Sequence, residues 1–222
     1  MTLFENTLRA IEPPDQEAGR IAKRRWDSLT KPRGSLGLLE EIVCRYAEIR
    51  CDRGAYDCAC ELAVFVADHG ISEAGVSAYP SSVTTEMLRN IAGGGAAISV
   101  LARHFGFPVR VFDVGVATDT RGENLAGVVY HRVGAGTGNF LRGSAMTREQ
   151  ARQSIETGIN IVREAVGRGV TMIGIGEMGI SNSTSAAALL SALAGIATER
   201  IAGRGAGLDD AGMMSNLGDR CG

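Results

Sequence analysis

The chain has 222 residues, of which 45% are hydrophobic and 22% are charged, as in an ordinary globular protein of one domain with room for a small appendage. Its 23 basic and 25 acidic residues nearly balance, which argues against a nucleic-acid or anionic-membrane partner. The first thirty positions contain the charged residues Glu5, Arg9, Glu12 and Asp15. These residues leave no apolar run for a signal peptide or a membrane span.

The first fifty residues carry two helical patterns. Apolar residues between Ala18 and Leu29 recur on one face, which predicts a helix. The segment KPRGSLG (31–37) breaks this pattern, and Ser35 can cap a second helix. We expect that second helix to turn four side chains inward, namely Leu39, Ile42, Val43 and Tyr46. The segment CDRGAYDCAC (51–60) is predicted to be a loop or a domain boundary.

Four short runs rich in β-branched residues follow. They are LAVFVA (62–67), VRVFDV (109–114), VVYHRV (128–133) and VTMIGI (170–175). Helical patterns over 81–104 and over 147–168, the second capped by Thr147, separate most of these runs, although no helix lies between the second and the third. Apolar strands that alternate with helices are typical of a parallel sheet covered on both faces, so the predicted fold class is α/β.

Each predicted strand runs into a polar or glycine-rich turn. The turns contain Asp68-His69-Gly70, Asp113-Val114-Gly115, GAGTGN (134–139) and GIGEMGISNST (174–184). The carboxyl ends of parallel strands meet at one edge of a sheet, and such folds bind their ligands there. We therefore expect the four turns to converge on one rim.

The segment GIGEMG (174–179) matches the G-x-G-x-x-G pattern between a strand and a helix that binds dinucleotides. That fingerprint normally opens its domain and needs an acidic residue about 20 positions further on. Here the segment follows three other predicted strands, and Glu199 lies at the right distance with no strand before it. The context therefore favours another kind of phosphate site over NAD.

Hydroxyl and amide side chains gather where the next helix begins, at Ser181, Asn182, Ser183 and Thr184. Free backbone N–H groups in a first helical turn, together with the helix dipole, favour a bound anion. Capping by Ser183 or Thr184 explains only one of the four. The carboxylate of Glu177 would repel a phosphate electrostatically. Its position is therefore explained by a function, such as accepting a proton or binding an N–H or hydroxyl of the substrate.

Structural and functional roles both remain open for two other turns. The GAGTGN segment can be an ordinary loop or a ligand cradle. Asp68 can contact a ligand or form a turn, whereas a locally hydrogen-bonded role is favoured for His69, because adjacent strand residues point to opposite faces. No second His or Cys lies near them to complete a metal site. The five cysteines form no C-x-x-C pair, which indicates reduced thiols in a cytoplasmic protein.

Five segments, in order, resemble one family, the nicotinate-nucleotide:dimethylbenzimidazole phosphoribosyltransferases of cobalamin lower-ligand activation. The segments are KPRGSLGLLE (31–40), VFVADHGISEAGVSAYPSSVT (64–84), FDVGV (112–116), GTGNF (136–140) with AMT (145–147), and GIGEMGISNSTSAAA (174–188). The resemblance covers almost all of the chain up to about Gly212. Five segments in the family's order make it specific.

The resemblance implies a Rossmann-like parallel sheet flanked by helices in residues 56–222, a small helical subdomain that begins in residues 1–55, and a homodimer. It implies that a ring nitrogen of 5,6-dimethylbenzimidazole, or of a related base, attacks C1′ of nicotinate mononucleotide. Nicotinate leaves, and α-ribazole 5′-phosphate forms with inverted configuration. The resemblance implies neither a metal nor an organic cofactor.

Carried onto this sequence, the resemblance implies three groups of site residues. The candidate catalytic residue is Glu177. The expected contacts to the base are Asp68, Tyr79, Pro80, Glu86 and Met87. The expected contacts to the nucleotide and its phosphate are Gly136, Gly138, Asn139, Gly176, Gly179, Ser181, Asn182, Ser183 and Thr184. Glu86 replaces a common Gln and Tyr79 a smaller residue of some members, which leaves the identity of the accepted base open.

Members of the family are substantially longer, and the resemblance implies that their main catalytic Glu lies beyond the end of this chain. Two hypotheses follow. The first is a phosphoribosyltransferase, and the alternative is a truncated, non-catalytic nucleotide-binding homologue or one half of a split enzyme. Both need GIGEMGISNST, so this motif does not discriminate between them. In either case we expect a partner or a second protomer to cover apolar surface on the sheet.

Overall fold

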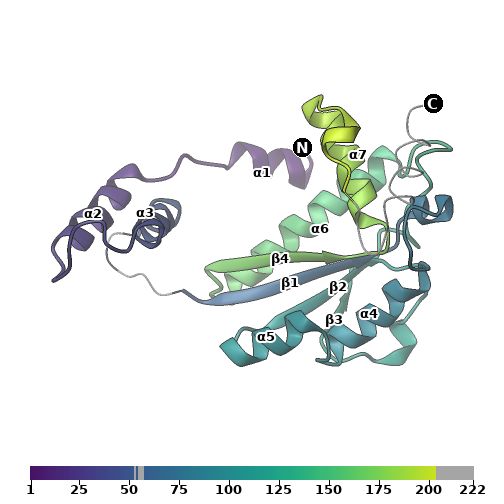
Figure 1. Ribbon diagram of the computed structural model, residues 1–222, viewed down its shortest axis with the longest axis horizontal. Coiled ribbons are helices and arrows are strands. Elements are labelled where there is room, and N and C mark those ends of the chain that lie inside the picture. Colours follow the sequence, from purple (N-terminus) through teal and green to yellow (C-terminus); the bar gives the residue numbers. More distant parts are fainter. Residues whose placement is uncertain (53, 55–57, 204–222) are drawn as a thin grey trace. The chain divides into compact units, whose positions relative to one another are not determined.

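A computed structural model describes residues 1–52, 54 and 58–203, which form two compact units divided between Ala59 and Cys60 (Figure 1). The regular structure of the first unit is helical, and the second unit contains the sheet. The predicted boundary between residues 55 and 56 and the end of the family resemblance, from 204 to Gly212, lie outside the described residues.

The helical unit contains α1 (Leu3–Arg9), α2 (Gln16–Asp27) and α3 (Leu38–Arg50). The carboxylate of Asp15 caps α2 by accepting hydrogen bonds from the backbone N–H groups of its first turn. Small side chains let α2 and α3 pack closely, and they are Ala18, Ala22 and Ala47. The helix predicted between Ala18 and Leu29 is confirmed, with both ends shifted by two residues toward the N-terminus.

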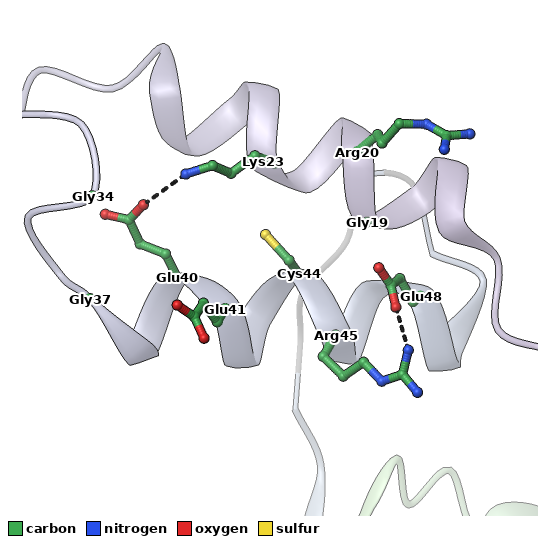
Figure 2. A pocket seen from close by; sticks show the side chains of 10 residues that line it. All are labelled: Gly19, Arg20, Lys23, Gly34, Gly37, Glu40, Glu41, Cys44, Arg45 and Glu48. Carbon is green, nitrogen blue, oxygen red and sulfur yellow. Dashed lines mark hydrogen bonds and ion pairs between the residues drawn. The ribbon is translucent and has the colours of Figure 1, made fainter.

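The start and the inner face of α3 differ from the prediction. Gly37, with a φ of +55°, is the N-cap residue, so Ser35 does not cap this helix. Leu39 and Ile42 are exposed, whereas Glu40 is buried and only 2% exposed. Two lysines pair with the Glu40 carboxylate, one of them shown in Figure 2, and this ion pairing turns Glu40 inward in place of the apolar residues.

The four predicted strands form one parallel sheet in the spatial order β3-β2-β1-β4, which confirms the α/β class. They are β1 (Cys60–Ala67), β2 (Val109–Gly115), β3 (Val128–Tyr130) and β4 (Met172–Met178). The third strand ends earlier than predicted. Beyond Tyr130 the chain follows the end of β2, where the N–H of His131 donates to Asp113 O at 2.8 Å.

The helices of this unit are α4 (Ser82–Ala92), α5 (Ala97–Phe105), α6 (Arg148–Gly167) and α7 (Asn182–Ala194). The single helix predicted over 81–104 is wrong, because three glycines (93–95) separate α4 from α5 and Gly94 has a φ of +82°. The prediction for α6 is confirmed, and Thr147 caps it in a reciprocal capping box with Gln150.

Helices cover both faces of the sheet, with α6 and α7 above it and α4 and α5 below it in Figure 1. On the lower face, Leu88 and Ile91 of α4 pack against Val66 of β1. On the upper face, Ile161 of α6 packs against Phe112 of β2. Among the described residues, no helix has the length and apolar character needed to cross a bilayer.

Candidate functional site

The turns after β1, β2 and β3 interlock at the carboxyl ends of the strands. The N–H of Asp68 donates to Gly115 O at 3.0 Å, and Asp68 O accepts from the N–H of Thr137 at 3.2 Å. The N–H of Gly70 donates to Thr137 Oγ1 at 3.1 Å. A Cβ at Gly70 would lie 2.4 Å from Thr137 O, so this contact requires glycine. The predicted convergence of these three turns is confirmed.

The turn between β4 and α7 joins the same rim. A Cβ at Gly179 would lie 2.2 Å from Ala67 O, which shows how closely this turn approaches the end of β1. The N–H of Ile180 donates to Oγ1 of Thr84 in α4 at 3.0 Å. All four predicted turns therefore meet at one edge of the sheet.

Strand packing accounts for one of the two strand glycines of GIGEMG, because a Cβ at Gly176 would meet nothing closer than Val64 at 4.0 Å. Gly174 and Gly176 lie within β4, and a Cβ at Gly174 would lie 2.5 Å from the side chain of Leu62 in β1. In the dinucleotide fingerprint the first two glycines form the turn between strand and helix. Here Gly179 alone lies in that turn, so the geometry agrees with the interpretation that disfavours NAD.

Asp68 holds the rim together through its side chain. It is 5% exposed, Oδ1 accepts from the Ser81 hydroxyl at 2.7 Å, and Oδ2 accepts from the N–H of Ala117 at 2.7 Å. These bonds join the end of β1 to the segment before α4 and to the loop after β2. Both carboxylate oxygens accept hydrogen bonds from distant segments, so in this structure the Asp68 side chain links segments and does not form a local turn.

The adjacent His69 points to a different partner. Its Nδ1 lies 2.9 Å from the hydroxyl of Ser185 in α7. Burial lowers the pKa of His69, and the neighbouring Asp68 carboxylate opposes this shift. The imidazole links the end of β1 to α7, so its hydrogen-bond partner lies far along the chain and not in its own turn, where the local prediction placed it.

Glu177, near the end of β4, is coupled to the start of α7. Its carboxylate accepts a hydrogen bond from the side-chain amide of Asn182. Although the Glu177 side chain is exposed, desolvation by neighbouring atoms raises its pKa above the ordinary value of 4.5, and the bond from Asn182 opposes this shift. The carbonyl oxygen of the same amide accepts from the N–H of Ser183 at 2.7 Å. A single side chain thus connects the candidate catalytic residue to the first turn of the helix.

Ser181 lies in this turn with a φ of +73°, a left-handed conformation that costs energy for any residue other than glycine. It is 6% exposed, and its hydroxyl has no hydrogen-bond partner. A cavity of about 130 Å³ lies here, lined by Val76, Ser77 and residues 178–183. A buried hydroxyl without a partner calls for an explanation, and a polar ligand in the cavity provides one.

The backbone N–H groups of the first turn of α7 are already bonded, contrary to the prediction that they are free. The N–H of Asn182 donates to Gly179 O, and those of residues 184–185 donate to Ser181 O. The left-handed Ser181 tightens the chain enough to form these bonds. The N–H of Ser183 instead donates to the side chain of Asn182. If the Asn182 side chain changes its rotamer, this N–H becomes available to donate to an anion.

The predicted base contacts do not gather in one place. Tyr79 and Pro80 are exposed in the loop before α4. Glu86 is exposed on α4 and pairs with Arg89 at 2.6 Å, whereas Met87 packs against the apolar core. Successive residues of a helix point about 100° apart, so these last two cannot both face the rim.

The predicted nucleotide-binding residues after β3 form hydrogen bonds within the loop to which they belong. Gly136 has a φ of +85°. The N–H of Gly138 donates to Ala145 O at 2.7 Å, and Oδ1 of Asn139 accepts from the N–H of Leu141 at 3.0 Å. In this structure these residues shape the loop that packs on the turn after β1.

Four residues of the site escaped the sequence analysis. Val76 and Ser77 line the cavity, Thr84 accepts from Ile180 in its wall, and Ser81 donates to Asp68 on the rim. All four lie in the segment 64–84 that carries the family resemblance. Small hydroxyl and apolar residues have no distinctive spacing, so the cluster of Ser and Thr over 81–85 was the one signal that could have found them.

A larger cavity, of about 550 Å³, lies between α2 and α3 in the helical unit (Figure 2). Four of its charged side chains form ion pairs, Lys23 with Glu40 at 3.6 Å and Arg45 with Glu48 at 2.6 Å. A second lysine, Lys31, bonds to Oε1 of the same Glu40 at 2.7 Å, whereas the buried Oε2 accepts no hydrogen bond. We assign the candidate site to the rim, because the four turns that follow the strands meet there beside a cavity.

A parallel sheet with helices on both faces and a cavity at its carboxyl rim define an α/β protein of the doubly wound kind, which binds its ligands at this edge. A family model described as phosphoribosyltransferase matches residues 11–217. The chain belongs to this phosphoribosyltransferase family.

Curated relatives named nicotinate-nucleotide–dimethylbenzimidazole phosphoribosyltransferase are similar over nearly the whole chain. The Chloroflexus aggregans protein is 43% identical over 98% of this chain and 61% of its own length. The Desulforamulus reducens protein is 46% identical over 95% and 60%. A crystal structure of CobT from Thermus thermophilus matches with a TM-score of 0.83 and 38% identity, over 91% and 60%. The chain thus spans about 60% of the length of these relatives.

Proposed function

We propose that the chain takes part in transferring the phosphoribosyl group of nicotinate mononucleotide to 5,6-dimethylbenzimidazole or a related base. The products are α-ribazole 5′-phosphate and nicotinate. The observation that carries this proposal is the buried, unpartnered hydroxyl of Ser181 beside the cavity at the carboxyl rim. The names of the relatives supply the two substrates, and the cavity supplies a place for the phosphate.

In this proposal the phosphate binds at the start of α7. The Ser181 hydroxyl donates to it, and the N–H of Ser183 becomes a second donor when the Asn182 side chain rotates away. The dipole of a 13-residue helix adds a favourable field for the anion. The left-handed strain at Ser181 is then part of the site, because it holds the hydroxyl in place before the ligand arrives.

Bond exchange at C1′ requires a proton acceptor. The lone pair of one base nitrogen forms the new bond, while the bond to nicotinate breaks and its electron pair stays on the pyridine nitrogen. The other base nitrogen then loses its N–H proton. We assign its acceptance to Glu177, whose raised pKa makes it a stronger base than an ordinary carboxylate. The resemblance places the family's main catalytic Glu outside this chain, so Glu177 supplies only part of the relatives' rate.

The test mixes the purified chain with nicotinate mononucleotide and dimethylbenzimidazole. Nicotinate and α-ribazole phosphate are followed by chromatography with mass detection. Removing a general base costs about 10²–10⁴ in rate, so Glu177→Gln is expected to lose most of the exchange. The matched control is Glu149→Gln, at an exposed carboxylate on α6, and this variant is expected to retain the exchange activity. Equal rates in the two variants would contradict the role of Glu177.

The pH dependence follows from the direction of the pKa shift. Only the ionised carboxylate accepts a proton, so exchange is expected to rise with pH through a midpoint above the ordinary 4.5 of Glu177. A rate profile of the unmodified chain measures this midpoint. A profile that is flat from about pH 4 upward would contradict a rate-limiting proton transfer to Glu177.

The alternative is a non-catalytic nucleotide-binding homologue or one half of a split enzyme. It predicts that calorimetry detects binding of nicotinate mononucleotide while no nicotinate is released. Under both hypotheses Ser181→Ala is expected to weaken this binding. Absence of binding by the unmodified chain would contradict both.

We further propose that the accepted base contacts Tyr79 and Pro80, whose exposure leaves them available, and that Asp68 acts indirectly by holding the loop before α4. A homodimer is supported by the family resemblance. A cytoplasmic location is supported by the five scattered cysteines of the sequence, which form no C-x-x-C pair.

A further inference from the structure

Another cavity lies at the carboxyl end of β3, at the opposite edge of the sheet from the Ser181 turn. Its volume is about 310 Å³. The lining residues come from the loop between β2 and β3, from the end of β3 and from α6, and they are Arg121, Tyr130, His131, Arg132, Gln153 and Thr157. The order β3-β2-β1-β4 puts three strand spacings, roughly 14 Å in all, between β3 and β4. The two cavities share no lining residue, so this one is separate from the proposed phosphate site.

The chemistry of the lining favours an anion. Every lining side chain carries a hydrogen-bonding group, the two charged ones are arginines, and no carboxylate of a described residue is among them. The carboxylates that neutralise the two guanidinium groups lie outside the lining, because Asp113 pairs with Arg132 and Asp119 pairs with Arg121. The surface offered to a ligand therefore presents N–H and O–H groups without a competing anion.

Arg132 is held in place by a buried ion pair. Its Nη1 donates to Asp113 Oδ2 at 2.7 Å and to Thr118 O at 3.3 Å. The side chain of Asp113 is 0% exposed and that of Arg132 is 15% exposed. Neither Nε nor Nη2 of Arg132 bonds to another described residue, so the edge of the guanidinium that matches an oxyanion bidentately is unused. A fixed arginine with an unused edge is preorganised for such a ligand.

The neighbouring side chains add further donors. The Nε2 atom of His131 is buried and has no hydrogen-bond partner among the described residues. Arg121 uses Nε and Nη2 for Asp119, which leaves its Nη1 unbonded within the described part of the chain. Gln153 and Thr157 lie four residues apart on α6, so they are neighbours on one face of the helix. A buried ring nitrogen without a partner calls for an explanation, and an oxyanion that accepts from it provides one.

We infer that this cavity binds a small oxyanion, either a phosphate or a carboxylate. The anion accepts from Nε and Nη2 of Arg132 and from Nη1 of Arg121, and the Thr157 hydroxyl donates to it from α6. Each arginine already pairs with a carboxylate, so hydrogen bonds supply the affinity and we expect a millimolar dissociation constant. The site lies outside the cavity of the proposed reaction and does not depend on that reaction.

The test titrates the ¹⁵N-labelled full chain with inorganic phosphate and, separately, with nicotinate. Nuclear magnetic resonance follows the backbone N–H signals of residues 130–132 and 153–157 and the side-chain Nε–H signal of Arg132. These signals are expected to move together with one midpoint, which gives the dissociation constant. The anion with the lower dissociation constant identifies whether the site prefers a phosphate or a carboxylate.

Arg121→Met removes one donor and is expected to weaken the binding about tenfold, as for a lost hydrogen bond to a charged group. The Arg121 side chain is 64% exposed, so this variant is expected to melt like the parent chain. The matched control is Arg142→Met, at an arginine that is 74% exposed and pairs with Glu73, and it should bind like the parent. Arg132 is left unchanged, because breaking a buried ion pair destabilises the fold.

No movement of these signals at millimolar concentrations of either anion would overturn the inference. Equal dissociation constants in the parent and in Arg121→Met would also overturn it. Ser181→Ala is expected to leave the titration unchanged, and its loss in that variant would show that the anion binds at the other edge of the sheet. The titration requires neither the nucleotide nor turnover, so its result stands whatever the nicotinate assay gives.

Discussion

One carboxylate, that of Asp68, connects three segments of the rim. Its two oxygens accept from Ser81 and Ala117, and its backbone bonds to the turns after β2 and β3. Sequence reasoning left turn formation and ligand contact equally open for this residue, because an aspartate at a strand end serves either role. The structure shows a third role, because the two donors to its carboxylate lie in segments far along the chain.

Asp68→Ala is expected to lower the free energy of unfolding by about 1–3 kcal/mol, because it leaves the N–H of Ala117 without its acceptor. The matched control is Asp119→Ala, which removes a carboxylate paired with Arg121 at the surface, and it should cost less than Asp68→Ala. Urea denaturation measures both. A smaller loss at Asp68 than at Asp119 would contradict the positioning role.

Among the helices, local signals predicted some boundaries and missed others. Thr147 caps α6 as expected, because its capping partner Gln150 lies within the same turn. Ser35 failed as a cap, because the left-handed Gly37 begins α3 two residues later. The exposed Leu39 shows that apolar periodicity alone does not assign the inner face when a buried ion pair competes for it.

Two glycine substitutions separate helix propensity from close packing. Gly158 lies within α6 with open space around its Cα, so Gly158→Ala is expected to raise the free energy of unfolding by about 0.5–1 kcal/mol. At Gly179 a Cβ would meet the backbone of Ala67, so Gly179→Ala is expected to lower it by about 1–3 kcal/mol. Thermal and urea unfolding check the signs, and a stabilising Gly179→Ala would contradict the close approach of β4–α7 to β1.

For the whole molecule, ligand binding at the rim is expected to stabilise the fold that builds it. At about 100 times its dissociation constant, nicotinate mononucleotide should add about 2.7 kcal/mol to the free energy of unfolding. The riboside without its 5′-phosphate, at the same concentration, should add much less, because the cavity at Ser181 is proposed to hold the phosphate. Thermal melts compare the two, and equal stabilisation would argue against a phosphate at Ser181.

The sequence by itself determined the α/β class, the succession of strands along the chain and the family, because strand composition, helix caps and motif segments are all local in the chain. Only the tertiary structure decided which rim residues meet. In the tertiary structure Glu86 is exposed whereas Met87 packs in the core. The N–H groups at the start of α7 that were expected to be free are hydrogen-bonded, and the Ser181 hydroxyl is buried without a partner. Residue patterns encode local propensity, whereas a cavity exists only where segments distant in sequence pack together.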